Sequence, residues 1–253
     1  MRAAAIVSGG AFALALAFGL PGRSRSNHVH ASGTGSDGAL AASADFTTGS
    51  GFIDVTLTNL LGASVIRSAG QALSDISFTL SNAPWTLTGT HILSGQLGNV
   101  SSTGVVTYVS GSPVRFLGEG PPPPGGTGFF SIVGNTITME AIGGGQPSEM
   151  ITPFVANGGT LSNVNNGFQN FNPYTIGPAT FELDLSGITT GTTVTAVTFS
   201  FGRAHTYTIG TRWFKDRLAS TTALPGKPGV SSSEAVSIVP VKKRWSICPV
   251  VGF

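Results

Sequence analysis

The sequence predicts an all-β fold, an antiparallel β-sandwich that is jelly-roll-like. Three observations predict this class. Roughly ten short segments alternate apolar and polar residues, clusters of Gly, Asn, Ser and Pro separate them, and almost no segment repeats with a helical period. The chain contains enough apolar side chains to form a hydrophobic core, because 16 Phe accompany many Val, Ile and Leu. Only 9% of its residues are charged. A right-handed β-solenoid ranks second, because Gly, Asn and Thr are abundant but no fixed repeat occurs.

The N-terminal residues are typical of an export signal. Arg2 supplies a positive start, residues 3–20 are small and apolar, and a Pro-Gly pair follows. We therefore expect a signal peptide over residues 1–31, with cleavage after Ala17 or Ala31, where small residues occupy the required positions. The alternative is a buried N-terminal helix.

Three further regions follow from changes in composition. Residues 32–44 are small and polar and predict a flexible lead-in. Residues 45–202 contain the alternating segments and predict one β-sandwich domain. Residues 203–253 are basic and predict an irregular or disordered tail.

Individual strands are indicated by alternation between turn signals. In residues 51–60 the alternation places Ile53, Val55 and Leu57 on the buried face. Gly134-Asn135 predicts a tight hairpin turn between two later strands. We expect strands at residues 51–60, 76–80, 85–92, 104–110, 113–117, 129–133, 136–142 and 150–156.

Two loops separate these strands. Residues 118–128 contain four successive prolines, which cannot donate to a sheet ladder, so they predict a surface loop. A partner that binds polyproline is the alternative interpretation of that segment. Residues 157–172 are rich in Asn and Gly and predict a second, long loop.

The strongest signal lies at residues 172–202, which predict a half-buried hairpin with a turn near Gly191. Its first strand should bury one side of the alternation and its second strand should do the same. The expected buried side chains are Phe181, Leu183, Leu185, Val197, Phe199 and Phe201.

Charge is distributed unevenly along the chain. Residues 32–202 contain nine acidic and two basic residues, a net charge of −7, whereas residues 203–253 contain two acidic and eight basic residues, a net charge of +6. The overall charge of +2 therefore describes neither part, and it does not indicate nucleic-acid binding. Cys248 is the single cysteine, so an intramolecular disulfide is excluded.

No catalytic residue is predicted. His91 is the single histidine of residues 45–202, and no Gly-x-Ser-x-Gly motif is present. Two carboxylate pairs, Glu140 with Glu149 and Glu182 with Asp184, have the residue types that glycosidases use. Alternate acids on a strand are ordinarily a solvated face, which is the interpretation we prefer.

Two kinds of ligand site remain as candidates. Calcium is favoured over zinc, because loop carboxylates and Asn carbonyls supply oxygen ligands, although we prefer the interpretation that these are ordinary turn residues. The candidate calcium ligands are Asp37, Asp45, Asn163, Asn165 and Asn166. Glycans could bind exposed aromatic rings, although anchoring of the Asn-rich loop to the core is the interpretation we prefer. The candidate rings are Trp85, Tyr108, Phe168, Phe171 and Tyr174.

The chain also resembles a known family. An alanine-rich export signal, segments such as DVTLTNLL and DISFTLSN, and a final strand TVTAVTFSFG resemble exported bacterial proteins of the PEP-CTERM type. The resemblance covers residues 1–202. It implies a following linker, a Pro-Glu-Pro sorting motif, an apolar span and a basic end, and it implies a role in envelope or exopolysaccharide biology.

The sequence departs from that family after Gly202. No Pro-Glu-Pro motif and no apolar span follow, and all four lysines of the chain lie in residues 203–253. We hypothesise that this segment is read out of frame or comes from a rearranged gene end. A genuine basic tail that binds an acidic polymer or a membrane surface is the alternative.

These observations together predict an exported, non-catalytic structural or adhesive protein, secreted or at the cell surface, in the cell envelope or extracellular matrix. A glycan-binding jelly-roll module is the second interpretation and a carbohydrate-active enzyme the third. The expected partners are extracellular polysaccharide or envelope components, without nucleic acid and without a membrane span in the mature chain. No cofactor is expected apart from the candidate calcium.

Overall fold

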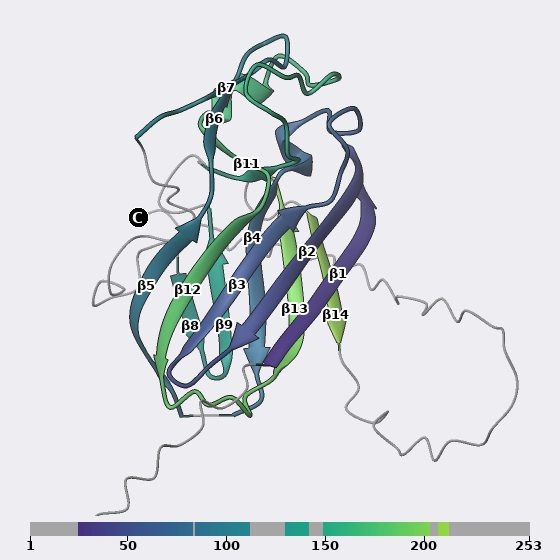
Figure 1. Cartoon of the computed structure of the whole chain (residues 1–253). Helices are drawn as coiled ribbons and strands as arrows, with labels where there is room; N and C mark the ends of the chain where they lie inside the picture. The colour runs from purple at the N-terminus through teal and green to yellow at the C-terminus, as the bar shows by residue number, and fades with distance from the viewer. Residues whose placement is uncertain (1–24, 83, 112–129, 142–148, 203–206, 213–253) are drawn as a thin grey trace, which may run out of the picture.

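The computed structural model describes residues 25–82, 84–111, 130–141, 149–202 and 207–212. Two β-sheets pack face to face, with the five-stranded sheet in front of the nine-stranded sheet in Figure 1. The predicted class, an all-β sandwich built mainly from antiparallel strands, is confirmed. Among the residues described, none belongs to a helix that is long and apolar enough to cross a membrane.

The five-stranded sheet is antiparallel throughout. Its strands, in spatial order, are β1 (Arg25–Gly35), β2 (Gly38–Thr48), β3 (Phe52–Asn59), β12 (Ala179–Ser186) and β5 (Thr86–Ser94).

The nine-stranded sheet is mixed, because β10 and β11 pair in parallel. Its main path is β14 (Tyr207–Arg212), β13 (Val194–Phe201), β4 (Leu73–Leu80), β10 (Ile151–Thr152), β11 (Tyr174–Ile176), β6 (Leu97–Val100) and β7 (Val106–Tyr108). The hairpin of β8 (Phe130–Val133) and β9 (Thr136–Glu140) joins this sheet through β4. Two short 3-10 helices lie in the connections between strands: η1 (Ala69–Gln71) precedes β4, and η2 (Phe168–Phe171) precedes β11.

The core lies between the two sheets because each strand turns one side of its alternation inward. On β3 the predicted residues Ile53, Val55 and Leu57 are fully buried. Phe46 of β2 and Phe78 of β4 meet across the sandwich with ring centroids 5.1 Å apart. The predicted hairpin turn at Gly134 is also confirmed, since this glycine has a φ of 59° between β8 and β9.

The predicted hairpin at residues 172–202 is wrong in its pairing. The six apolar side chains expected on its buried faces are buried. However, β12 pairs with β3 and β5 in one sheet, whereas β13 pairs with β4 and β14 in the other. Both strands face the same core from opposite sides, and alternation alone does not distinguish that arrangement from a hairpin.

The expected flexible lead-in at residues 32–44 is wrong. β1 and β2 form a regular hairpin that pairs from Arg25 opposite Thr48 to Gly35 opposite Gly38. Within residues 32–44 the buried side chains are Leu40, Ala42, Ser43 and Ala44, of which only Leu40 is large and apolar, so the apolar alternation was weak in the sequence.

The same hairpin overlaps the expected signal peptide. Residues 25–31 lie in β1, and cleavage after Ala31 would remove most of that strand. Residues 1–24, with the alternative site after Ala17, lie outside the described residues.

The expected domain boundary at residue 202 is also wrong. β14 pairs with β13 from Phe201 opposite Tyr207 to Ala196 opposite Arg212, and Ile209 is 8% exposed. The sandwich therefore extends to Arg212. The remaining tail, residues 213–253, and the proline-rich loop lie outside the described residues, so the out-of-frame hypothesis stays a hypothesis.

Candidate functional site

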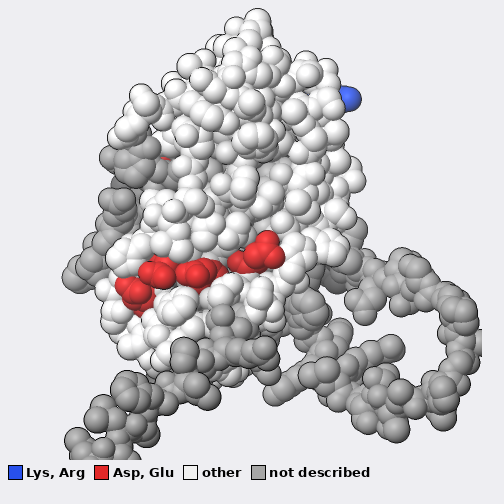
Figure 2. Space-filling view, viewed as in Figure 1, with Lys and Arg blue, Asp and Glu red and all other residues white. Residues whose placement is uncertain are grey.

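Four carboxylates form a row across the outward face of the five-stranded sheet. We call these residues, Asp45, Asp54, Glu182 and Asp184, the acidic row. They project from β2, β3 and β12 at the positions that alternate with buried apolar residues. Figure 2 shows them as one continuous red band over the front sheet of Figure 1. The row exists because three strands place their acids at neighbouring levels of the sheet.

Strand register joins the centre of the row to its β5 end. Glu182 of β12 lies directly opposite Asp54 of β3 on one side and directly opposite His91 of β5 on the other. Residues directly opposite in an antiparallel sheet have Cβ atoms about 4.5–5.5 Å apart, so their side chains interact. One line of side chains thus crosses three strands.

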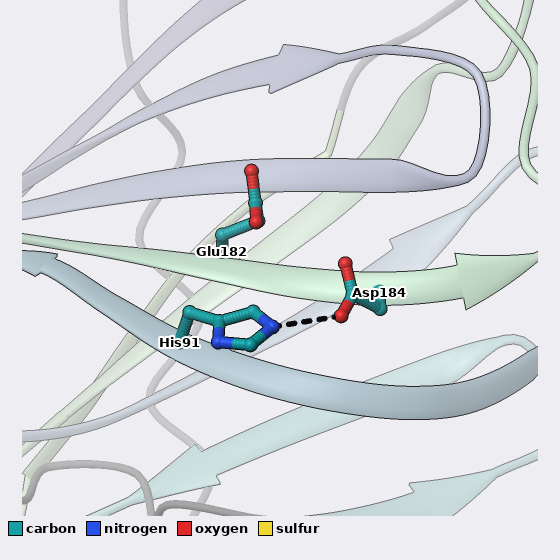
Figure 3. Close-up of side chains that lie close together, drawn as sticks. All are labelled: His91, Glu182 and Asp184. Atoms are coloured by element: carbon teal, nitrogen blue, oxygen red, sulfur yellow. Dashed lines mark hydrogen bonds and ion pairs between the residues drawn. The ribbon is translucent and has the colours of Figure 1, made fainter.

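At the β5 end of the row, a histidine joins two carboxylates. His91 Nε2 lies 2.9 Å from Asp184 Oδ2, and the two side chains are 58% and 36% exposed. One ligand atom from each of His91, Glu182 and Asp184 lies within 4.8 Å of the other two. Figure 3 shows the His91 ring reaching along β5 to Asp184, with Glu182 beside them on β12. We call these three residues the His91 triad.

A glycine makes room for this contact. Gly89 of β5 lies directly opposite Asp184. A Cβ built on Gly89 would lie 2.6 Å from Asp184 Oδ2, which is too close for two non-bonded atoms. The missing side chain therefore allows the Asp184 carboxylate to lie over β5, where it meets His91. Glycine within a strand often marks such a close approach.

The centre of the row is a carboxyl pair. Burial raises the pKa of Glu182, and the negative charges of Asp54 and Asp184 raise it further, against a smaller opposing effect of His91. Burial also raises the pKa of Asp54, whereas a hydrogen bond with Glu182 lowers it. Like charges directly opposite each other thus favour retention of a proton by this pair.

The β1 end of the row has a second histidine and carboxylate contact. His28 Nδ1 lies 2.6 Å from Asp45 Oδ1, and both side chains are about half exposed, at 57% and 47%. His30 follows on the same face of β1, and its ring centroid is 6.0 Å from that of His28. The only Lys or Arg side chain that the described residues place is Arg67, in the connection between β3 and η1.

Two of the five aromatic rings that were candidates for glycan binding are not accessible to solvent. Phe168 and Tyr174 are fully buried and stack with ring centroids 4.5 Å apart. The Tyr174 hydroxyl donates to the backbone oxygen of Phe168 at 2.8 Å. Glycan binding through these two rings is therefore wrong, because a buried ring has no free face; they anchor the Asn-rich loop.

The other three predicted rings are half-buried. Trp85 and Phe171 pack against the core, and the Tyr108 hydroxyl donates to the backbone oxygen of Val155 at 2.8 Å. They come from separate connections and strands, so their role in glycan binding stays a prediction.

The five predicted calcium ligands are divided between two places. Asp45 belongs to the acidic row and contacts His28. Asp37 and Asn165 both line a shallow hollow of about 250 Å³ beside η1. Exposed Asn163 donates its side-chain amide to the backbone oxygen of Ser64, and Asn166 is exposed in the same loop. Calcium binding by Asp37 and the loop stays a prediction, whereas Asp45 lies in a different site.

The two carboxylate pairs do not form one cleft. Glu140 lies on β9 of the nine-stranded sheet, and Glu149 is buried with a φ of 62°. Glu182 and Asp184 point outward from the opposite sheet. Sequence analysis treated the latter two as a solvated pair and His91 as an isolated histidine. It missed their association, because 93 positions separate His91 from Asp184 and no local pattern shows which strands will be neighbours.

Comparisons with known proteins give no family for this chain: no family model matches it, and neither a curated protein nor a solved structure shows significant similarity. The site must therefore be interpreted from its own chemistry. An exposed row of carboxylates with a histidine contact at each end can accept hydrogen bonds, attract cations and bind a metal ion.

Proposed function

We propose that this chain is an exported, non-catalytic structural or adhesive protein of the cell envelope or extracellular matrix, and that the acidic row is its contact surface. One observation carries the proposal. The ionisable side chains of the site project from a continuous sheet face rather than converging in a hollow.

The dimensions of this face suit an extended partner. From His28 on β1 to His91 on β5 the row crosses four strand spacings, which amounts to about 19 Å. A surface of this length can contact several units of a polymer at once. Enzymes instead enclose a small substrate in a concave site.

The chemistry also suits an envelope partner. Carboxylates accept hydrogen bonds from sugar hydroxyl groups, and they attract amino groups on a polymer. The face lacks a described Lys or Arg that would neutralise the row from within the chain. A cationic group of a partner could pair with the carboxylates of this face.

The first test locates the protein. Producing cells are separated into cytosolic, envelope and matrix fractions, and an antibody against the full chain measures its distribution. Enrichment in the envelope or matrix fraction supports the proposal, and recovery mainly from the cytosol contradicts it.

The second test concerns the contact surface. Purified full-length protein is incubated with isolated envelope and matrix material, and the retained fraction is measured. We compare the wild type with the double variant Asp45→Asn/Asp184→Asn. The matched control, Asn99→Lys/Gln169→Lys, changes the net charge by the same amount at two exposed positions elsewhere.

We expect the row variant to lose about fivefold in affinity, which corresponds to about 1 kcal/mol, while the control retains wild-type affinity. Equal behaviour of the two variants would show that net charge, and not the row, governs retention. Incubation should also leave the chain length of the matrix polysaccharide unchanged. Shortened polysaccharide would instead favour a carbohydrate-active enzyme.

A further inference from the structure

The His91 triad has the geometry of a metal-binding site. One possible ligand atom from each of the three side chains lies within 4.8 Å of the other two, and His91 Nε2 lies 2.9 Å from Asp184 Oδ2. In a tetrahedral zinc site with bonds near 2.0–2.1 Å, neighbouring ligand atoms are about 3.3 Å apart. Small side-chain rotations would therefore bring these atoms to coordination distance.

All three residues of the triad lie on two paired strands, β5 and β12, and none lies in a loop. β5 and β12 pair from Thr180 opposite Ser94 to Ser186 opposite Thr86, and all three ligands lie within that paired region. The register shifts just after Asp184, and bulges of this kind commonly redirect a side chain next to a functional site.

Gly89 provides a second, independent feature of the site. Any side chain at this position would meet the Asp184 carboxylate. The φ of Gly89 is not among the positive values that favour glycine, so the backbone itself does not require glycine here. The space above Gly89 instead accommodates the carboxylate that completes the triad.

We propose that His91, Glu182 and Asp184 bind a divalent transition metal ion of the zinc type. One imidazole nitrogen and two carboxylate oxygens are ligands that zinc accepts, whereas calcium prefers sites made of oxygen alone. The two carboxylates balance the 2+ charge. The exposure of the triad leaves further coordination positions open to water or to a group on a partner.

Asp54 supports the site from outside the triad. Its carboxyl group forms a hydrogen bond with Glu182 from the neighbouring strand. Such partners of a ligating carboxylate orient it, and their removal typically weakens metal binding by about 10–100-fold. The ordered contacts thus run across three strands from Asp54 to His91.

The test is calorimetric titration of the full-length protein with ZnCl2 after treatment with a chelator. All proteins carry Cys248→Ser, because a cysteine thiolate can bind zinc independently of the triad. We compare the wild-type site with His91→Gln. The matched control is His30→Gln, which removes an exposed histidine from the same sheet face but outside the triad.

We expect one zinc ion per chain, a loss of at least about 10-fold in affinity for His91→Gln, and no change for His30→Gln. Gly89→Ala should also weaken binding while leaving every ligand in the chain. Circular dichroism confirms the fold of each variant. Absence of zinc binding, or equal affinity in His91→Gln and the wild type, would overturn the proposal, and so would tight calcium binding without zinc binding.

This inference goes beyond the proposed function and is tested separately from it. Titration requires only the pure protein and the metal, whereas retention requires envelope material. Zinc binding without retention would leave the metal site standing and contradict the contact surface. Retention without zinc binding would do the reverse.

Discussion

The two outward faces of the sandwich follow the same strand alternation but carry different chemistry. On the nine-stranded sheet, Thr79 and Thr136 hydroxyls lie 2.9 Å apart, and the Thr138 hydroxyl donates to that of Ser77 at 3.1 Å. We call these four residues the hydroxyl face. On the five-stranded sheet the equivalent positions hold the acidic row. The four residues of the hydroxyl face pair with one another, and the four residues of the acidic row are like charges.

The difference follows from what each group can donate. A hydroxyl both donates and accepts, so two neighbouring threonines satisfy each other. An ionised carboxylate only accepts, so two of them repel unless a proton, a histidine or a cation lies between them. The hydroxyl face is therefore complete in itself, whereas the acidic row is suited to an external partner. The following predictions test this contrast.

The largest effect should come from the core that both faces share. We expect Phe46→Ala to reduce the free energy of unfolding by about 3–5 kcal/mol, because the fully buried ring contacts Phe78 from the opposite sheet. Denaturant unfolding with guanidinium chloride measures the change. A loss below 1 kcal/mol would mean that the two sheets do not depend on this contact.

Zinc should raise the free energy of unfolding of the protein by binding at the acidic row, and not at the hydroxyl face. At a zinc concentration about 100 times the dissociation constant, linkage adds about 2.7 kcal/mol to the free energy of unfolding. Chelation should remove this gain in the wild type. Thermal unfolding of His91→Gln should show a much smaller zinc effect, and an undiminished effect would place the metal elsewhere.

Hydroxyl pairing predicts a smaller effect. Thr79→Val leaves the half-buried Thr136 hydroxyl without this partner, so we expect a loss of about 0.5–1.5 kcal/mol. Adding Thr136→Val removes both hydroxyls and should recover part of the loss. Urea unfolding of the two single variants and the double variant measures the coupling, and strict additivity would contradict internal pairing.

The smallest expected change in the free energy of unfolding concerns the carboxyl pair of Asp54 and Glu182. Here the substitution should stabilise the protein rather than destabilise it. Asp54→Asn replaces a repulsion with an amide that can donate to Glu182, so the free energy of unfolding at pH 7 should rise by about 0.2–1 kcal/mol. Unfolding at pH 7 in the presence of a chelator measures this change. A destabilised variant would show that the pair attracts at neutral pH.

The same pair predicts a dependence on pH. The pKa values of Asp54 and Glu182 are raised above the ordinary 3.8 and 4.5, so the folded protein holds their protons more tightly than the unfolded chain. Stability from this pair is therefore present at low pH and falls as the pH rises from these ordinary values through the raised ones. Asp54→Asn should reduce that fall between pH 4 and pH 7, as measured by unfolding at each pH. An unchanged slope would exclude the pair as its source.

Much of the fold could be predicted from single strands. The buried sides of β3, β12 and β13 were predicted correctly, because period-two alternation is a local property of the chain. The lead-in at residues 32–44 was misassigned because its buried side chains are mostly small, Ala42, Ser43 and Ala44, and such residues carry little apolar signal although they fit between packed sheets. The hairpin at residues 172–202 was misassigned because proximity in sequence does not decide sheet membership.

The site was less predictable than the fold. Each residue of the His91 triad was visible in the sequence, but each had an ordinary interpretation by itself. Gly89 carried no signal at all, since its role depends on Asp184 lying opposite it. Phe168 and Tyr174 were candidate ligand-binding rings in the sequence, but they are buried because their loop folds onto the core.

The sequence by itself determined the all-β class, the inward and outward sides of the main strands, and the excess of acid over base before residue 203. Tertiary structure alone decided which strands became neighbours, and hence which charges met. The physical reason is the distance along the chain over which each effect acts. Alternation and turn propensity act over a few residues. The pairing of β5 with β12 instead joins residues that are 86 to 100 positions apart, and it depends on how all the strands together bury the core.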